Sequence, residues 1–166
     1  MAEAEITMRL AQRADAAVLL AFLQRVAPES DAILLPGLDH VTVAEEAVRL
    51  SAVADRDDCL ILLACLGPEI VGVLTIMNLA ATPGVGEMGL VIAKRYWHQG
   101  IGRLLMEEGQ YWFENYSTLD QLMLTVFEHN IWGKKLYQDI GFQTVGTLLE
   151  PAADGQVKPA TKMVYP

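Results

Sequence analysis

Residues 89–103 decide how the rest of this chain is interpreted, and they read GLVIAKRYWHQGIGR. The first five are small or apolar and predict a buried strand, whereas apolar side chains at helical spacing predict a long helix over Ile101–Tyr116. A basic turn joins the two. The first N–H groups of a helix have no partner within it, and the helix dipole is positive at that end, so this turn is a natural anion site.

Two glycines in the turn, Gly100 and Gly102, remove side chains that would keep a phosphate from the backbone. An ordinary strand-to-helix turn would also accommodate them. The common nucleotide motifs do not fit, because no Gly-Lys-Ser/Thr sequence follows and Leu105 stands where a dinucleotide fingerprint needs its third glycine.

Working outward from this stretch, alternation, helical periodicity and turn residues predict the other elements. Strands are expected at Ile6–Ala11, Cys59–Cys65, Ile70–Leu79, Gly86–Ala93, Gln121–Val126, Phe142–Leu149 and Val157–Val164. Helices are expected from an Asp15 cap to Val26, from Thr42 onward with Glu45 completing a capping box, over Ile101–Tyr116, and over Asn130–Ile140. This order predicts one α/β (α+β) domain over residues 1–166, with a mixed central sheet and helices on both faces.

Composition narrows the function classes. With 166 residues, 52% of them hydrophobic and 20% charged, the chain is expected to fold into one compact domain. A formal net charge of −9 argues against nucleic acid as a partner. No apolar run approaches the roughly 20 residues that span a bilayer, and the segment Met1–Glu5 does not resemble a secretory signal, so no membrane partner and a cytoplasmic location are expected.

The two cysteines, Cys59 and Cys65, are expected to be inert core thiols. They lie at the two ends of one predicted strand, roughly 20 Å apart, which is beyond disulfide reach. No metal site is expected.

A second informative stretch covers residues 126–142, which read VFEHNIWGKKLYQDIGF. Asn130 and Tyr137 are seven residues apart and therefore lie on nearly one helical face, about 10 Å from each other. Gly133 stands between them, where glycine costs up to about 1 kcal/mol relative to alanine. Its presence is easier to explain if something packs closely against it.

Together the two stretches resemble the GNAT superfamily of N-acetyltransferases. Its acyl-CoA-binding signature is Arg/Gln-x-x-Gly-x-Gly/Ala, and residues 97–102 read WHQGIG, with Trp97 replacing the leading basic residue. The later family motif, Asn-x-x-Ala/Gly-x-x-Leu-Tyr followed by Gly-Phe, matches from Asn130 to Phe142. The resemblance covers roughly Cys59 to Met163. It implies a mostly antiparallel sheet of six or seven strands, acetyl-CoA as cosubstrate, and a small-molecule or peptide amine as acceptor, with a homodimer plausible.

The resemblance also implies roles for particular residues. Tyr137 would donate a proton to the departing CoA sulfur, and a backbone N–H near Ile92 would stabilise the oxyanion. Asn130 would cap its helix, contact the cofactor, or both. Backbone amides would hold the pyrophosphate at Gln99, Gly100, Ile101, Gly102 and Arg103, while Leu90, Val91 and Ile92 would pair with the pantetheine arm.

Glu87 is the candidate general base, directly or through a water. It interrupts an otherwise small and apolar strand a few residues before the thioester-binding segment. An amine attacks a thioester only as the free base, so a proton acceptor is needed nearby.

Two other functions remain open from the sequence: a non-catalytic acyl-CoA-binding module on the same fold, and an interaction protein whose glycine turn is incidental. Pro28–His40 and the turn at Thr82–Val85 are expected to line the acceptor pocket. The acidic residues in the first of these segments suit a cationic amine, although a solvated loop explains them equally well; they are Glu29, Asp31 and Asp39. Three tryptophans are interpreted as packing residues, namely Trp97, Trp112 and Trp132.

Overall fold

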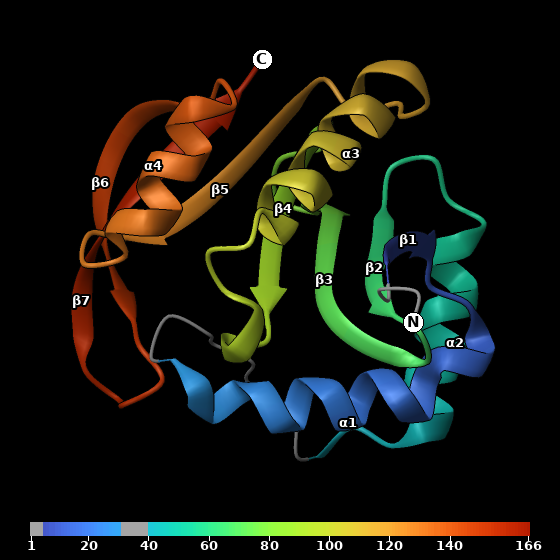
Figure 1. Cartoon of the computed structure of the whole chain (residues 1–166). Coiled ribbons are helices and arrows are strands. Elements are labelled where there is room, and N and C mark those ends of the chain that lie inside the picture. The colour runs from blue at the N-terminus through green and yellow to red at the C-terminus, as the bar shows by residue number, and fades with distance from the viewer. Residues whose placement is uncertain (1–4, 31–39) are drawn as a thin grey trace.

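A single sheet forms the centre of the molecule in the computed structural model, which describes residues 5–30 and 40–166 (Figure 1). Its strand order is β1-β2-β3-β4-β5-β7-β6. The strands are β1 Ile6–Leu10, β2 Leu60–Leu66, β3 Glu69–Asn78, β4 Val85–Ile92, β5 Gln121–Phe127, β6 Gln143–Pro151 and β7 Val157–Tyr165. Neighbours run antiparallel except β4 and β5, which are parallel. The predicted mixed, mostly antiparallel sheet is therefore confirmed.

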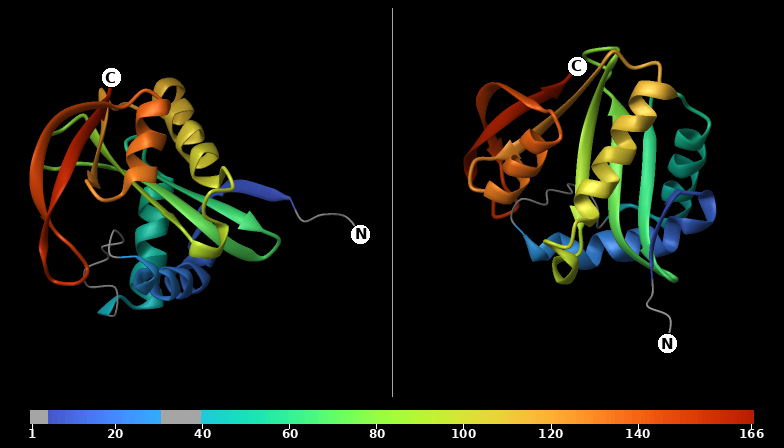
Figure 2. Two further views of the ribbon diagram at one scale, coloured as in Figure 1. Left: turned by 60° about the vertical axis from the view of Figure 1, so that its left-hand side comes forward. Right: turned by 45° about the horizontal axis from the view of Figure 1, so that its top comes forward.

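Helices cover both faces of this sheet, also as predicted. They are α1 Ala16–Val26, α2 Val43–Ala54, α3 Ile101–Asn115 and α4 Ile131–Asp139. Figures 1 and 2 show α3 and α4 over one face and α1 and α2 over the other. Short 3₁₀ helices that the sequence did not predict lie at Arg13–Asp15, Ala27–Glu29 and Lys94–Tyr96.

The predicted helix caps differ in outcome. Thr42 caps α2, because its Oγ1 accepts the Glu45 N–H at 3.1 Å while a Glu45 carboxylate oxygen accepts the Thr42 N–H at 3.2 Å. Asp15 stands at the N-cap position of α1 as predicted, but its side chain makes no capping hydrogen bond to α1. The Asp15 carboxylate accepts the Gln12 N–H at 2.7 Å and binds the Arg9 guanidinium, which lowers the pKa of Asp15.

The core lies between the sheet and its helices. On one face, α3 buries Leu105 and Met106 completely against the strands. On the other, α1 buries Leu19 and Phe22. Both cysteines are buried and free, as expected. Among the described residues, no helix combines the length and apolar character that crossing a bilayer requires.

Two adjacent leucines of α3 test this packing. Leu105 is 0% exposed and Leu104 is 48% exposed. Leu105→Ala should lower the free energy of unfolding by about 2–5 kcal/mol, because it removes a buried side chain and leaves a cavity. Leu104→Ala is the matched control and should change it by no more than about 1 kcal/mol. Urea denaturation measures both, and equal losses would contradict the orientation of α3.

Candidate active site

The sheet opens at β4. Residues Gly86–Ile92 of β4 pair with β3, but only Val85–Glu87 pair with β5, opposite Gln121–Met123. Figure 1 shows the two strands spreading apart beyond that point. The edge of β4 after Glu87 therefore offers backbone groups to something other than a neighbouring strand.

Alternation decides which residues of β4 face the opening. Just beyond β4, the Ala93 N–H donates to the Val71 carbonyl at 3.0 Å. In an antiparallel ladder, every second residue turns its N–H and C=O toward the same neighbour. Val91 therefore points its main chain at β3, whereas Leu90 and Ile92 point theirs at the opening. This geometry favours Leu90 and Ile92 over Val91 as main-chain partners of a ligand.

Six successive backbone N–H groups, those of residues 98–103, have no hydrogen-bond acceptor among the described residues. The first bond at the start of α3 runs from the Leu104 N–H to the Gly100 carbonyl, at 3.1 Å. Left-handed conformations at His98 (φ 60°) and Gly100 (φ 84°) alternate with Gln99, and such alternation turns neighbouring N–H groups toward one concavity, an anion-binding nest. The predicted residues Gln99–Arg103 all lie in this donor turn, which we define as residues 98–103.

Basic side chains surround the donor turn, although some are paired. Arg103 forms an ion pair with Glu107 at 2.7 Å. Lys94 lies over the Trp97 ring, with 5.8 Å from its Nζ to the ring centroid. Lys94 therefore brings a positive charge toward the turn, whereas Glu107 offsets the charge of Arg103.

Asn130 is the N-cap of α4, since its Oδ1 accepts the Gly133 N–H at 3.0 Å. A Cβ at Gly133 would lie 2.6 Å from Asn130 Nδ2. The close neighbour expected at this glycine is thus the cap itself. The cofactor contact expected of Asn130 stays a prediction.

The two family motifs meet in space. The rings of His98 and Trp132 lie 4.5 Å apart between centroids. Leu136 Cδ2 lies 3.6 Å from where a Cβ at Gly102 would be. The start of α4 therefore packs beside the donor turn.

Tyr137 is half-buried on α4, with its ring centroid 6.2 Å from that of Phe142. Its hydroxyl has no hydrogen-bond partner among the described residues. In that part of the chain every fully buried polar side-chain atom has a partner, so this hydroxyl is not fully buried. The hydroxyl is therefore accessible to a ligand. Burial raises the pKa of Tyr137 to about 12, so the phenol stays protonated at neutral pH.

Glu87 is exposed at the point where β4 and β5 part. Its neighbour Met88 is buried beneath α3. Because successive side chains of a strand point to opposite faces, Glu87 points toward the face covered by α1 and α2. Among the described residues Glu87 has no ion pair. Glu87 and Tyr137 thus approach the opening from opposite sides of the sheet.

Another glutamate near α4, Glu128, is less suited to act as a base. Lys134 Nζ binds its carboxylate at 2.8 Å and the Thr161 hydroxyl donates to it. Both contacts lower the pKa of Glu128, with Lys134 as the larger cause. A carboxylate held in this way is a weaker proton acceptor.

Sequence reasoning missed two contacts of the site. The Trp97 indole N–H donates to the Ile92 carbonyl at 2.7 Å, so Trp97 does more than pack. The Glu29 carboxylate accepts the Lys94 N–H at 3.0 Å. Glu29 is therefore already engaged, whereas its expected companions in acceptor binding, Asp31 and Asp39, lie outside the described residues together with the rest of 31–39. No local signal links positions 29 and 94, whereas the unusual Trp97 was visible in the motif.

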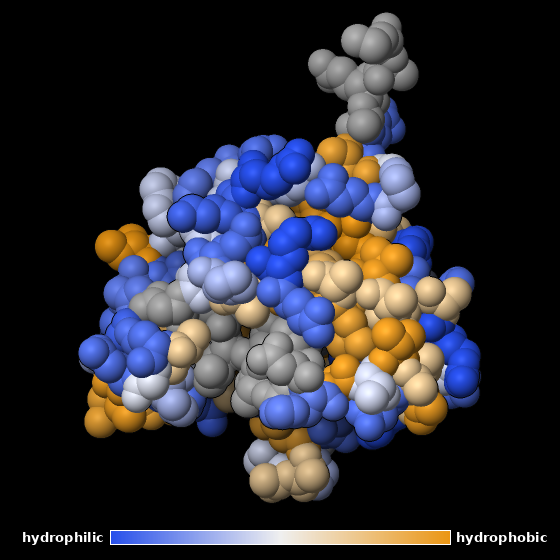
Figure 3. Space-filling model, turned by 90° about the horizontal axis from the view of Figure 1, so that it is seen from below, coloured by the Kyte–Doolittle hydropathy of each residue, from blue (hydrophilic) through white to orange (hydrophobic). Residues whose placement is uncertain are grey.

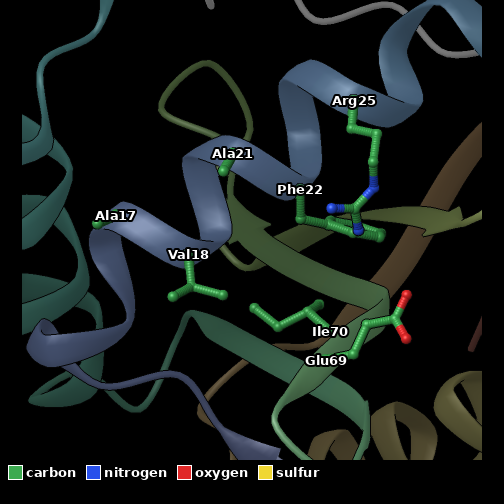
Figure 4. A pocket seen from close by; sticks show the side chains of 7 residues that line it. All are labelled: Ala17, Val18, Ala21, Phe22, Arg25, Glu69 and Ile70. Atoms are coloured by element: carbon green, nitrogen blue, oxygen red, sulfur yellow. The ribbon is translucent and has the colours of Figure 1, made fainter.

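A cavity of about 280 Å³ lies elsewhere, between α1 and the start of β3 (Figure 4). Mostly apolar side chains line it, joined by Arg25 and Glu69. Figure 3 shows the molecule from below. Many of the hydrophobic residues of that view lie to the right of its centre, and mostly hydrophilic residues lie to the left and at the top. None of the predicted site residues lines the cavity, so we do not assign the chemistry to it. Within residues 5–30 and 40–166, no group of three or more side chains has a metal-binding arrangement.

Comparison with known proteins agrees with this geometry. The model of the acetyltransferase (GNAT) family matches residues 29–142. The L-amino acid N-acetyltransferase AaaT of Escherichia coli K12 is 32% identical over 96 residues, which are 57% of this chain and 59% of that protein. The match therefore spans less than two thirds of this relative.

Solved structures extend the likeness over nearly the whole chain. An acetyltransferase of the GNAT family from Streptococcus pneumoniae has a TM-score of 0.89 and 34% identity, covering 97% of this chain and 99% of its own. The yncA protein of Salmonella typhimurium, solved with its cofactor acetyl-CoA, has a TM-score of 0.76 and 15% identity over 96% of this chain and 92% of its own, and so shares the fold alone. With its family model matched over residues 29–142 and a solved member matched along almost its full length, this chain belongs to the GNAT family of acetyltransferases.

Proposed function

We propose that this protein transfers the acetyl group of acetyl-CoA to a primary amine of a small molecule or peptide. The observation that carries the proposal is the run of six N–H groups in the donor turn that have no acceptor within residues 5–30 and 40–166; the turn follows the opened edge of β4 by a short corner. Membership of an acetyltransferase family favours catalysis over a non-catalytic binding module. In the same proposal, residues 1–166 form one domain that works in the cytoplasm.

Acetyl-CoA would bind along two neighbouring subsites. The donor turn would hold the pyrophosphate through the N–H groups of Gln99–Arg103, where the positive end of α3 adds attraction. Leu90 would pair with the pantetheine arm through the unpaired edge of β4. Ile92 would contribute only its N–H, because its carbonyl already accepts the Trp97 indole N–H. The amide nitrogen of Asn130 remains available for a cofactor contact, since the cap uses only its oxygen.

The chemistry needs one proton acceptor and one proton donor. Glu87, directly or through a water, would take the proton that the amine loses as its nitrogen bonds to the acetyl carbon. The carbon–sulfur bond then breaks and the sulfur leaves as a thiolate. Tyr137 would stabilise that thiolate, and a backbone N–H near Ile92 would stabilise the oxyanion.

The raised pKa of Tyr137 qualifies its role. A phenol with a pKa of about 12 holds its proton more firmly than an ordinary tyrosine does. Tyr137 would therefore act by donating a hydrogen bond to the developing thiolate, because full transfer of its proton to a thiolate of much lower pKa is uphill.

The acceptor is an amine of a class still to be identified. The relative AaaT is named as an L-amino acid N-acetyltransferase, which makes L-amino acids the first class to test. Purified protein should release CoA from acetyl-CoA with at least one member of a panel of L-amino acids, small amines and peptides. Tight acetyl-CoA binding without turnover of any member would favour the non-catalytic module.

Replacing Tyr137 by Phe tests the proton donor. The variant keeps the ring beside Phe142 and loses only the hydroxyl, so kcat should fall by roughly 10²- to 10⁴-fold. The exposed Tyr116, changed to Phe, is the matched control. Because the pKa of Tyr137 is about 12, the wild-type kcat should show no alkaline loss due to this group between pH 7 and pH 10. Unchanged turnover of the Tyr137→Phe variant would remove Tyr137 from the mechanism.

Two glycines with nearly the same backbone conformation test the donor turn. Gly100 (φ 84°) and Gly155 (φ 83°) both have open space where a Cβ would stand. Changing either one to Ala should cost about 1–2 kcal/mol of stability through the left-handed conformation. Only Gly100→Ala should weaken acetyl-CoA binding in calorimetry, because it displaces the neighbouring N–H groups. Equal affinities of the two variants would argue against the turn as the phosphate site.

We also propose that the protein forms a homodimer through β6. This edge strand exposes Val145 (56%) and Leu149 (68%), and exposed apolar edge strands tend to pair with another chain. Sedimentation analysis should show a dimer in the wild type and a shift toward monomer when both residues are changed to Lys. A monomeric wild type would reject this part of the proposal.

A further inference from the structure

Hydrogen bonds hold both ends of two successive peptide groups at the corner between β4 and the donor turn. The first of these peptide groups joins Ile92 to Ala93. The Ile92 carbonyl accepts the Trp97 indole N–H at 2.7 Å, and the Ala93 N–H donates to the Val71 carbonyl at 3.0 Å. Because a peptide group is planar, bonds at both of its ends fix the direction of the plane.

The next peptide group, from Ala93 to Lys94, is held in the same way. The Ala93 carbonyl accepts the Tyr96 N–H at 2.8 Å. The Lys94 N–H donates to the Glu29 carboxylate at 3.0 Å, a charge-assisted bond across 65 positions of sequence. Four hydrogen bonds thus fix two successive peptide groups, whereas the N–H groups of residues 98–103 have no acceptor among the described residues.

This corner lies between the two proposed subsites for acetyl-CoA. The opened edge at Leu90 and Ile92 precedes it, and the donor turn follows it. The pantetheine arm and the pyrophosphate belong to one covalent molecule, so they cannot adjust to the protein independently. The protein must therefore keep the two subsites at one spacing.

We propose that Trp97 and Glu29 are positioning residues that set this spacing. The inference rests on the proposed function, and it assigns neither residue a contact with reacting atoms. Trp97 binds the carbonyl of Ile92, and the N–H of Ile92 faces the opening. Glu29 connects the corner to the 3₁₀ helix Ala27–Glu29, which follows α1. Trp97 occupies the position at which the family signature has a basic residue. At this position the chain therefore has a neutral N–H donor, which binds the backbone carbonyl of Ile92.

The affinities of the variants for two ligands distinguish a positioning role of Trp97 and Glu29 from a general role in stability. Acetyl-CoA spans both subsites, whereas adenosine 5′-diphosphate 3′-phosphate, the nucleotide half of CoA, reaches only the donor turn. In Trp97→Phe and Glu29→Ala, the dissociation constant of acetyl-CoA should rise roughly tenfold while that of the nucleotide half stays within about twofold, since only the spanning ligand depends on pre-set spacing. NMR titration measures both constants.

Kinetics and matched variants sharpen the test. The kcat/KM for acetyl-CoA should fall roughly ten- to a hundredfold in the same variants, because small misplacements of a reacting group are costly. Glu29→Gln should restore most of the loss, since its amide oxygen can still accept the Lys94 N–H. Trp112→Phe and Glu108→Ala change the same two residue types at positions on α3, away from the corner. Both control variants should behave as wild type.

Two results would overturn the inference: unchanged acetyl-CoA affinity in both variants, or parallel weakening of both ligands, which would indicate a general loosening of the fold. If Trp97→Phe does not fold, the comparison of Glu29→Ala with Glu29→Gln decides alone. The ratio of the two dissociation constants needs no turnover. A wild type that binds acetyl-CoA but acetylates nothing would therefore contradict the proposed function and leave this test intact.

Discussion

Six backbone N–H groups at and just before the start of α3, which have no acceptor in the described part of the chain, are the feature on which the rest of the site depends. A polar group without a partner is costly in a dry interior and tolerable only where water or a ligand can reach it. Left-handed residues at positions 98 and 100 keep these groups facing one concavity instead of continuing α3 backward by another turn. The helix dipole then adds a positive field at the same place. An anion with several oxygens is the ligand that satisfies such an arrangement.

The opening of the sheet provides the second half of the site. β4 is fully paired on one edge and loses its partner on the other after Glu87. A ligand strand can occupy the vacated edge, and the side chains on the two faces of the sheet can then act on it from opposite directions. Glu87 belongs to one face, and Tyr137 comes from the helix over the other. The proposed base and the proposed proton donor therefore lie on different faces of the sheet, and among the described residues no hydrogen bond joins them.

Local patterns made most of the fold predictable. The two motif stretches, the Thr42 capping box and the Asn130 cap depend on residues within a few positions of each other, and the sequence displays them directly. The donor turn was also predictable, because a glycine pair before an amphipathic helix is a local signal. The divergence of β4 from β5 could not be predicted. The paired residues of the two strands lie more than 30 positions apart in the sequence, and no local pattern marks Glu87 as the last paired residue of β4.

Contacts between distant segments explain the failures. The sequence suggested that Asp15 caps α1, but Arg9 on β1 and the Gln12 N–H engage its carboxylate instead. Glu29 looked like part of an acceptor loop, and its carboxylate binds the backbone 65 residues away. In both cases an acidic side chain had several plausible partners, and only the tertiary fold selects one. Trp97 illustrates the converse, because its position in the motif was visible while its hydrogen bond to Ile92 was not.

Amide hydrogen exchange with and without acetyl-CoA tests the central claim most directly. Without ligand, the amides of residues 98–103 should exchange rapidly, because none has a hydrogen-bond partner where the structure describes the chain. At saturating acetyl-CoA, several of the six should become protected, whereas the amides of the exposed turn at Gly155 should keep the exchange rates that they have without ligand. Protection that appears elsewhere while residues 98–103 continue to exchange freely would contradict the assignment of this turn as the binding site.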